Sequence, residues 1–313
     1  MTIPNHSKTE HDKPVGHPRA HEPVMAQEVV QFLCAKRPLR IVDATVGTGG
    51  HAAALLAAAP EAACLLGLDR DGTALAVAAK TLSRFGSRVI LHHGDFADLT
   101  AAMRHAGFAE IDALLADLGM SSFVLDDPNR GFSLRLDGPL DMRMDQQSPT
   151  CAKDLVNDAS EAELARIIWA YGQEPAARRI ARAIVTARRH REIATTGELR
   201  SIVEGVRGRA RRGRIHPATR TFQALRIAVN HELEQLGWML EKAPALLSPS
   251  GRIAIIAYHS LEDRPVKKRF LELAASGEFN MPAGRLLRPC PAEVARNARA
   301  RSARLRCLAR VAS

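Results

Sequence analysis

Residues 41–51 have the sequence IVDATVGTGGH, a short apolar run followed by three glycines within four positions. The alanine- and leucine-rich residues 52–59 come next, so the order predicts a strand, a tight turn and a helix. Glycines let a ligand approach the backbone, and a helix start offers free N–H groups. The spacing fits a dinucleotide fingerprint ending in alanine, which leaves open a nicotinamide cofactor, S-adenosylmethionine, or a turn without a ligand.

The chain is basic, with a formal net charge of +10 over 313 residues. Arginine supplies 36 of its 44 basic residues. Positive charge favours an anionic partner such as nucleic acid, although a GC-rich genome also produces arginine- and alanine-rich chains. The length is sufficient for about two domains.

The five cysteines are widely spaced and form no C-x-x-C pair, which argues against a disulfide framework or a structural metal and favours a reducing compartment. No apolar run reaches the length of a membrane span. Residues 1–20 are polar, contain three prolines and lack the apolar core of a signal peptide. We therefore expect a disordered tail on a cytoplasmic protein.

Apolar runs that alternate with helical patterns follow the glycine turn. Strands are expected at residues 64–69, 88–93 and 111–117, with a helix at 73–82 after the first of them. Such alternation is typical of right-handed crossovers and of a parallel sheet covered on both faces. The predicted fold class is therefore α/β.

Three side chains follow the carboxyl ends of these strands, where parallel sheets bind ligands. Asp69 lies 20 residues after Gly49 and could accept hydrogen bonds from both ribose hydroxyls; the alternative is a helix-capping acid. Phe96 could pack on an adenine or belong to the core. Asp117 could meet the methionine end of a cofactor or a reacting amine, or it could only cap its loop.

A helical region interrupts the strand pattern. Residues 160–206 carry two capping patterns, Ser160-x-x-Glu163 and Thr195-x-x-Glu198, and residues 218–240 predict one long amphipathic helix. A strand is expected again at residues 252–258. The simplest division is a core of residues 21–140 and 217–313, with residues 141–216 as an inserted, helical, basic domain that binds the substrate.

Positive charge is concentrated in the same region. Residues 178–226 contain 14 arginines and three acidic residues. A charge run is commonly a solvated helix face, but the glycine-interleaved arginines of residues 207–214 suit a flexible contact to RNA phosphates. Further arginines at residues 296–306 suggest a second basic strip.

Six segments carry a resemblance to a known family. They are GTGGH (47–51), DLGMSS (117–122), RGFS (130–133), DGPLDMRMD (137–145), HPATRTFQALR (216–226) and HSLEDR (259–264). In this order the chain, from about residue 21 to the RARS segment at 299–302, resembles the bacterial 16S ribosomal RNA cytosine-N(4) methyltransferase family, called RsmH or MraW. One glycine motif is weak, whereas this set is highly specific.

The resemblance implies a class I methyltransferase fold, Rossmann-like with a mostly parallel sheet and an inserted all-helical domain. It implies S-adenosylmethionine as the methyl donor and cytosine 1402 of 16S ribosomal RNA, in the small ribosomal subunit, as the target. The implied cofactor contacts are Gly49, Gly50, His51, Asp69, Phe96 and Asp117. Members of the family usually have a glutamine that touches the cofactor shortly after the two serines. Val124 occupies that region here and cannot make a side-chain hydrogen bond.

Methyl transfer to a cytosine amine needs an in-line approach and a hydrogen-bond acceptor at the amine, because the ring delocalises the nitrogen lone pair. Asp117 is the first candidate for this catalytic acceptor, and Ser121 and His259 are secondary candidates. A NAD-dependent oxidoreductase and a non-catalytic RNA-binding protein are the alternatives. The first leaves the basic insertion unexplained, and the second leaves the ribose-binding constellation unexplained. The sequence does not specify an oligomeric state.

Overall fold

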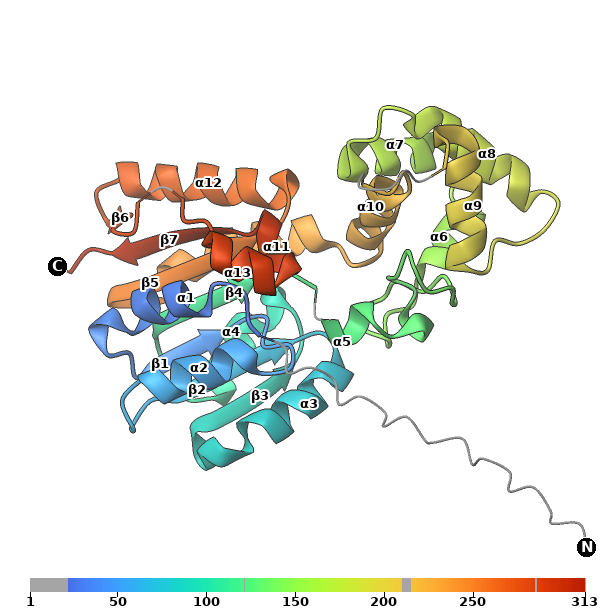
Figure 1. The fold of residues 1–313 in the computed structure, drawn as a ribbon. Coiled ribbons are helices and arrows are strands. Elements are labelled where there is room, and N and C mark those ends of the chain that lie inside the picture. The colour runs from blue at the N-terminus through green and yellow to red at the C-terminus, as the bar shows by residue number, and fades with distance from the viewer. Residues whose placement is uncertain (1–21, 121, 210–214, 285, 313) are drawn as a thin grey trace, which may run out of the picture.

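The computed structural model describes residues 22–120, 122–209, 215–284 and 286–312. It contains a sheet covered by helices on both faces, with a cluster of helices to one side of it (Figure 1). The predicted tail, Ser121, and Arg211, Arg212 and Arg214 of the predicted arginine loop lie outside the described residues.

The sheet has seven strands in the order β3-β2-β1-β4-β5-β7-β6, and β1 to β5 are mutually parallel. The order reverses between β1 and β4, so their carboxyl ends open onto a shared crevice. This arrangement confirms the predicted α/β class with a mostly parallel sheet. The strands are β1 (Arg40–Asp43), β2 (Cys64–Asp69), β3 (Val89–His93), β4 (Ile111–Asp117), β5 (Leu247–Ala257), β6 (Phe279–Asn280) and β7 (Arg304–Arg310).

Apolar side chains on both faces bury the central strands of the sheet. Leu65 packs into the core on one side of the sheet and Leu66 into the core on the other. The helices of the first face are α1 (Ala26–Leu33), α2 (Gly50–Ala58) and α3 (Gly72–Leu82). Those of the second face are α4 (Leu99–His105), α11 (Glu232–Lys242) and α12 (Ser260–Ala275).

The C-terminal segment departs from the predicted basic strip at Arg304 and Arg306, which pair with Asp263, whereas Arg296 and Arg301 are exposed. It contains the short helix α13 (Pro291–Arg296) and then β7, which pairs antiparallel with both β5 and β6. Leu305 and Cys307 are buried against one face of the sheet, and Leu308 against the other. Arg306 is also buried, because its charge is paired with Asp263. The arginines of this segment obscured the sequence pattern of β7, a strand in which most residues are buried.

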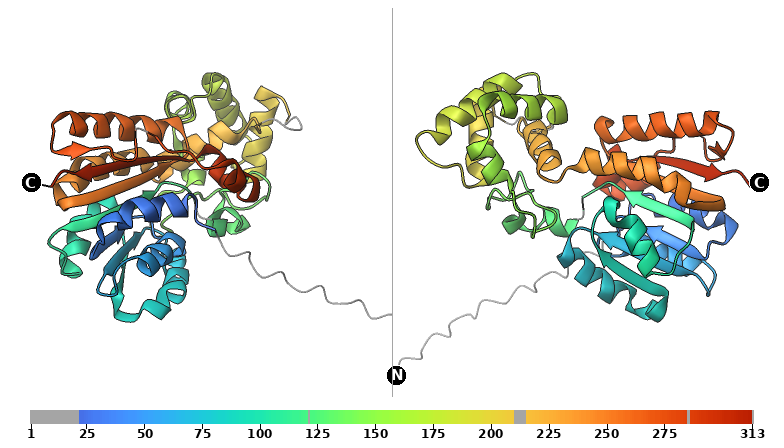
Figure 2. Two further views of the ribbon diagram at one scale, coloured as in Figure 1. Left: turned by 60° about the vertical axis from the view of Figure 1, so that its left-hand side comes forward. Right: turned by 180° about the vertical axis from the view of Figure 1, so that it is seen from behind.

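The helical region forms a hydrophobic core of its own beside the sheet (Figure 2). It is helical as predicted: Thr195 and Glu198 form a capping box, and the Ser160 side chain accepts the Glu163 N–H at the start of α7. This core also includes Val124, Phe132 and helix α10, which the sequence division had assigned to the methyltransferase core. The helices are α6 (Ala152–Asp158), α7 (Glu161–Gly172), α8 (Ala177–Arg188), α9 (Thr196–Arg207) and α10 (Thr219–Val229).

The expected single helix at residues 218–240 is two helices, so that prediction is wrong. Helix α10 ends at Val229, and α11 begins at Glu232. Between them, the Asn230 side-chain amide donates to the carbonyls of Met142 and Arg226, and His231 adopts a left-handed conformation with φ 50°. The apolar stripe therefore divides: α10 packs in the helical cluster and α11 on the sheet.

None of the described helices combines the length and apolarity that crossing a membrane requires.

Candidate active site

A pocket of about 410 Å³ opens at the carboxyl ends of the strands. One wall comes from the glycine loop, β2 and the residues after β3; the other comes from α10, α11 and the start of α12. Asp117, at the end of β4, lies between these walls because β4 separates β1 from β5 in the sheet. The pocket therefore joins segments that are more than 200 residues apart in the sequence.

The glycine loop is fixed by its own backbone and by Asp69. Gly47 and Gly49 have φ angles of 52° and 89°, in the region that favours glycine. The Gly47 N–H donates to Oδ2 of Asp69 at 2.7 Å, and Gly50 begins helix α2. Gly47, Gly50 and His51 line the pocket. A Cβ on Gly49 would instead face Leu82 at 3.1 Å, so Gly49 shapes the turn from behind.

Asp69 ends β2, and both of its oxygens accept backbone hydrogen bonds. Oδ1 accepts from the Asp71 N–H at 2.9 Å, while Oδ2 holds Gly47. Burial raises the pKa of Asp69, and these two N–H groups counteract the shift. Each oxygen retains a lone pair for a ligand hydroxyl. Phe96, at the start of the 3₁₀ helix η3 (Phe96–Asp98), is partly buried and lines the same end of the pocket.

Asp117 is held by neighbours on three elements. Its Oδ1 accepts the Gly119 N–H at 3.1 Å, and its Oδ2 lies 3.7 Å from Nδ1 of His51. Burial raises the pKa of Tyr258, and Asp117, to which the Tyr258 hydroxyl is hydrogen bonded, raises it further. The other ring nitrogen of His51 lies 2.9 Å from the Val24 carbonyl. Asp117 thus has a fixed orientation at the centre of the pocket.

Asp43, at the end of β1, is a buried acid that the sequence analysis did not select. Its Oδ1 accepts the Thr45 N–H at 3.2 Å, whereas Oδ2 is buried with no hydrogen-bond partner among the described residues. Burial raises the pKa of this carboxyl to about 7, and the Asp117 and Asp69 carboxylates add to the shift. The Asp43 carboxyl is therefore partly protonated and partly ionised at neutral pH.

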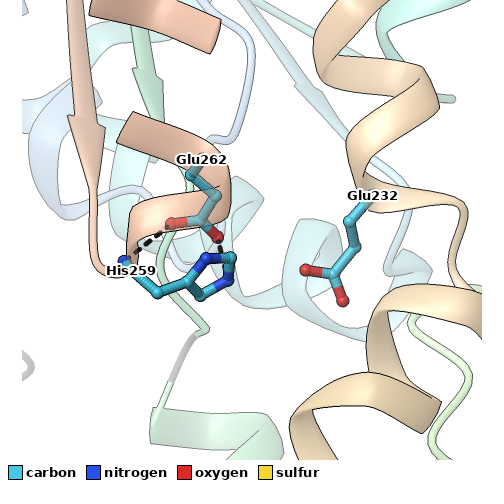
Figure 3. Close-up of side chains that lie close together, drawn as sticks. All are labelled: Glu232, His259 and Glu262. Atoms are coloured by element: carbon cyan, nitrogen blue, oxygen red, sulfur yellow. Dashed lines mark hydrogen bonds and ion pairs between the residues drawn. The ribbon is translucent and has the colours of Figure 1, made fainter. Parts of the chain in front are cut away.

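The second wall contains four charged or titratable side chains: Arg226, Glu232, His259 and Glu262. Arg226 donates from Nε to Oε1 of Glu232 at 2.8 Å and from Nη2 to Oε2 at 2.7 Å. Figure 3 shows Glu232 on α11 facing His259 and Glu262 at the start of α12. A ring nitrogen of His259 lies 2.9 Å from Oε1 of Glu262, a close contact without hydrogen-bond alignment. The predicted residue His259 is therefore in the pocket.

Glu232, His259 and Glu262 could supply three ligand atoms to a metal ion, since these atoms lie within 4.8 Å of one another. Both oxygens of Glu232, however, are occupied by the Arg226 guanidinium. Oε2 of Glu262 accepts the Tyr258 N–H at 2.8 Å. A divalent ion would have to displace a cation that already neutralises Glu232. These three side chains therefore fit a charged, hydrogen-bonded pocket wall better than a metal centre.

The structure brings together the described members of the predicted site, with Gly49 behind the turn rather than in the pocket wall. Val124, the departure from the family pattern, is buried and lines the pocket with an apolar side chain. Sequence analysis missed Arg226, Glu232 and Tyr258. Arg226 and Glu232 were overlooked because both fall within the segment predicted as one amphipathic helix. Tyr258 was overlooked because it is the last residue of a predicted apolar strand.

Comparisons with known proteins show the family of the chain. The sequence profile of the MraW methylase family matches residues 19–311. Ribosomal RNA small subunit methyltransferase H of Thermomicrobium roseum is 45% identical over 307 residues, covering 93% of this chain and 94% of the relative. The protein of the same name from Sorangium cellulosum is 44% identical over 312 residues, covering 99% and 96%.

Among solved structures, an rRNA methylase from Streptococcus thermophilus has 14% identity and a TM-score of 0.37, covering 91% of this chain and 93% of that one. That likeness is too distant to carry an argument about the site. The profile match and the sequence relatives span nearly the whole chain. The chain therefore belongs to the MraW methylase family.

Proposed function

We propose that this chain is an S-adenosylmethionine-dependent methyltransferase that modifies N4 of cytosine 1402 in 16S ribosomal RNA, within the small ribosomal subunit and in the cytoplasm. Family membership supports methyl transfer to ribosomal RNA of the small subunit. The observation that carries the proposal is the position of Asp117, between a glycine loop and a wall of charged side chains in one pocket.

The glycine-loop wall fits the donor. When bound, S-adenosylmethionine supplies a methyl group that its positively charged sulfur has already activated. Asp69 offers free lone pairs to the ribose hydroxyls, and Phe96 offers a ring face to the adenine. Gly47, Gly50 and His51 leave room at the start of α2. The Asp117 carboxylate places negative charge where a cationic ligand would lie.

Asp117 also fits the role of acceptor at the cytosine amine. A carboxylate that accepts one amine N–H localises the lone pair of the nitrogen and stabilises the charge that develops during transfer. Because the Gly119 N–H and Tyr258 hold the carboxylate, its orientation does not have to be set during the reaction. His259 is the second candidate from the opposite wall. Ser121, the third, lies outside the described residues.

The helical cluster fits the RNA side of the reaction. Arg178 and Arg189, at the two ends of α8, are exposed, as is Arg209 after α9. Exposed guanidinium groups can pair with backbone phosphates and hold a large RNA without reading its sequence. The target base must leave its stack to enter the pocket. We propose that this cluster positions the subunit while the sheet holds the donor.

Two measurements test this function. In equilibrium binding, S-adenosylmethionine should bind and NAD should not. Tritiated methyl transfer to small subunits from a strain that lacks the modification, followed by nucleoside mapping, should place the label on N4 of one cytosine. Binding of NAD alone would support an oxidoreductase, and RNA binding without donor binding would support a non-catalytic protein.

A further inference from the structure

The charged wall opposite the donor site contains a guanidinium, that of Arg226, one nitrogen of which is hydrogen bonded to a weak acceptor. Arg226, in the last turn of α10, directs Nε and Nη2 to Glu232. The partner of its Nη1 is the thioether sulfur of Met120 at 2.9 Å, a weak acceptor. Burial opposes the charge of Arg226, but Glu232 and Glu262 more than compensate and raise its pKa. Arg226 therefore remains a cation in the pocket wall, and its Nη1 lies beside Met120, which also lines the pocket.

The position of Arg226 is set by residues on both sides of the break between α10 and α11. Glu232 is the first residue of α11, and its two oxygens match the planar fork of the guanidinium. Its side chain is 12% exposed and that of Arg226 is 17% exposed. Few solvent molecules therefore compete for Nη1, and a hydrogen bond made there counts more than one at the surface.

We propose that Arg226 is the residue that selects cytosine, an inference that rests on the proposed function. In this assignment its Nη1 donates to the acceptor atoms of the pyrimidine edge, O2 and N3, while N4 points to Asp117. Glu232 is a positioning residue that acts through Arg226. A cytosine presents two acceptors and one amine donor, whereas a uracil presents an N–H at position 3 and a carbonyl at position 4. A cationic donor beside a carboxylate acceptor therefore accepts cytosine and leaves unpaired groups against uracil.

The test compares four proteins in two assays. The variants are Arg226→Lys, Arg226→Met combined with Glu232→Gln, and a control that combines Arg40→Met with Asp112→Asn. The control removes a charge pair at the amino ends of β1 and β4, away from the pocket. One assay measures methyl transfer to unmodified small subunits. The other measures binding, with S-adenosylhomocysteine present, of reconstituted subunits that carry cytidine or uridine at the target position.

For the parent and the control, we expect cytidine subunits to bind about 10- to 100-fold more tightly than uridine subunits. The double variant should bind both equally and lose about 10- to 100-fold in kcat/KM, mainly through KM, with an unchanged dissociation constant for S-adenosylmethionine. Arg226→Lys keeps the charge without the fork, so it should keep part of the preference. If the double variant does not fold, the cytidine preference of Arg226→Lys alone tests the assignment.

Three results would overturn the assignment. One is a parent that methylates subunits but binds the two kinds equally, and another is a variant that keeps the full preference. The third is binding of Mn²⁺ to the parent protein that His259→Ala abolishes, because a metal at this cluster would take Glu232 from Arg226. Absence of methyl transfer and of donor binding in the parent would instead refute the proposed function itself.

Discussion

Nε of Arg306 on β7 donates a hydrogen bond to Oδ1 of Asp263 on α12 at 2.6 Å. Both side chains are buried, and Nη1 of Arg304 reaches the other oxygen of Asp263 at 3.0 Å. Asp263 is four residues after His259, in the first turn of the helix that begins at the pocket. The last strand therefore fixes the helix that carries one wall of the candidate active site.

Removing one partner of this pair should be costly. Arg306→Met leaves the Asp263 carboxylate buried beside Arg304 alone, so we expect a loss of about 3–5 kcal/mol in the free energy of unfolding, measured by urea denaturation. The double variant Arg306→Met with Asp263→Leu should lose less, since both buried charges are removed and the remaining guanidinium of Arg304, 34% exposed, is solvated. Equal losses in the two variants would show that packing, rather than charge, sets the cost.

Asp69 provides a prediction for donor binding. Asp69→Ala removes the acceptor of the Gly47 N–H and the proposed ribose contact, so affinity for S-adenosylmethionine should fall by about 1–3 kcal/mol, measured by calorimetry. Asp154→Ala is a matched control, because Asp154 lies outside the pocket lining and its Oδ2 accepts the Cys151 N–H at 2.9 Å at the start of α6. An unchanged affinity in folded Asp69→Ala would remove Asp69 from the donor site.

The stability of the protein should depend on pH through Asp43. The folded-state pKa, about 7, is above the ordinary value of 3.8, so the folded protein holds this proton more tightly than the unfolded chain. The contribution is therefore present at low pH and is lost as pH rises towards 7. Between pH 5 and pH 8 we expect a loss of about 2.5 kcal/mol in unfolding free energy from this group.

Asp43→Asn should remove that dependence, because the amide does not titrate. The measurement is the difference in unfolding free energy between parent and variant at each pH, which cancels the titration of other groups. A difference that stays constant from pH 5 to pH 8 would contradict the assigned pKa.

The exposed arginines of the helical cluster provide a prediction for RNA binding. Replacing Arg178, Arg189 and Arg209 with glutamine should weaken binding to small subunits and reduce the slope of log K against log salt by about 2, if each contacts one phosphate. Donor affinity should stay unchanged. The control replaces three exposed arginines of the sheet domain: Arg37, Arg84 and Arg104. Equal effects of the two sets would mean that only net charge matters.

The parallel sheet and the position of the glycine-loop wall were predictable because local patterns encode them. The apolar run before the glycines and the acid that ends the strand at residues 64–69 both lie where the sequence placed them. The charged wall was not predictable from local patterns. Arg226 belongs to an amphipathic helix, and its pairing with Glu232 depends on a break at His231 that the apolar stripe continues across. β7 was missed because its arginines masked the alternation, and the partner that neutralises Arg306 is 43 residues away.

The pocket has a consequence for how the protein is made. Pro23 and Ser302 both contribute to its lining, together with residues from the middle of the chain. At translation rates of about 5–20 residues per second, roughly 15–60 s pass between the start of synthesis and the addition of Ser302. A nascent chain therefore cannot form the complete pocket until residue 302 has been synthesised, long after its glycine loop has been made.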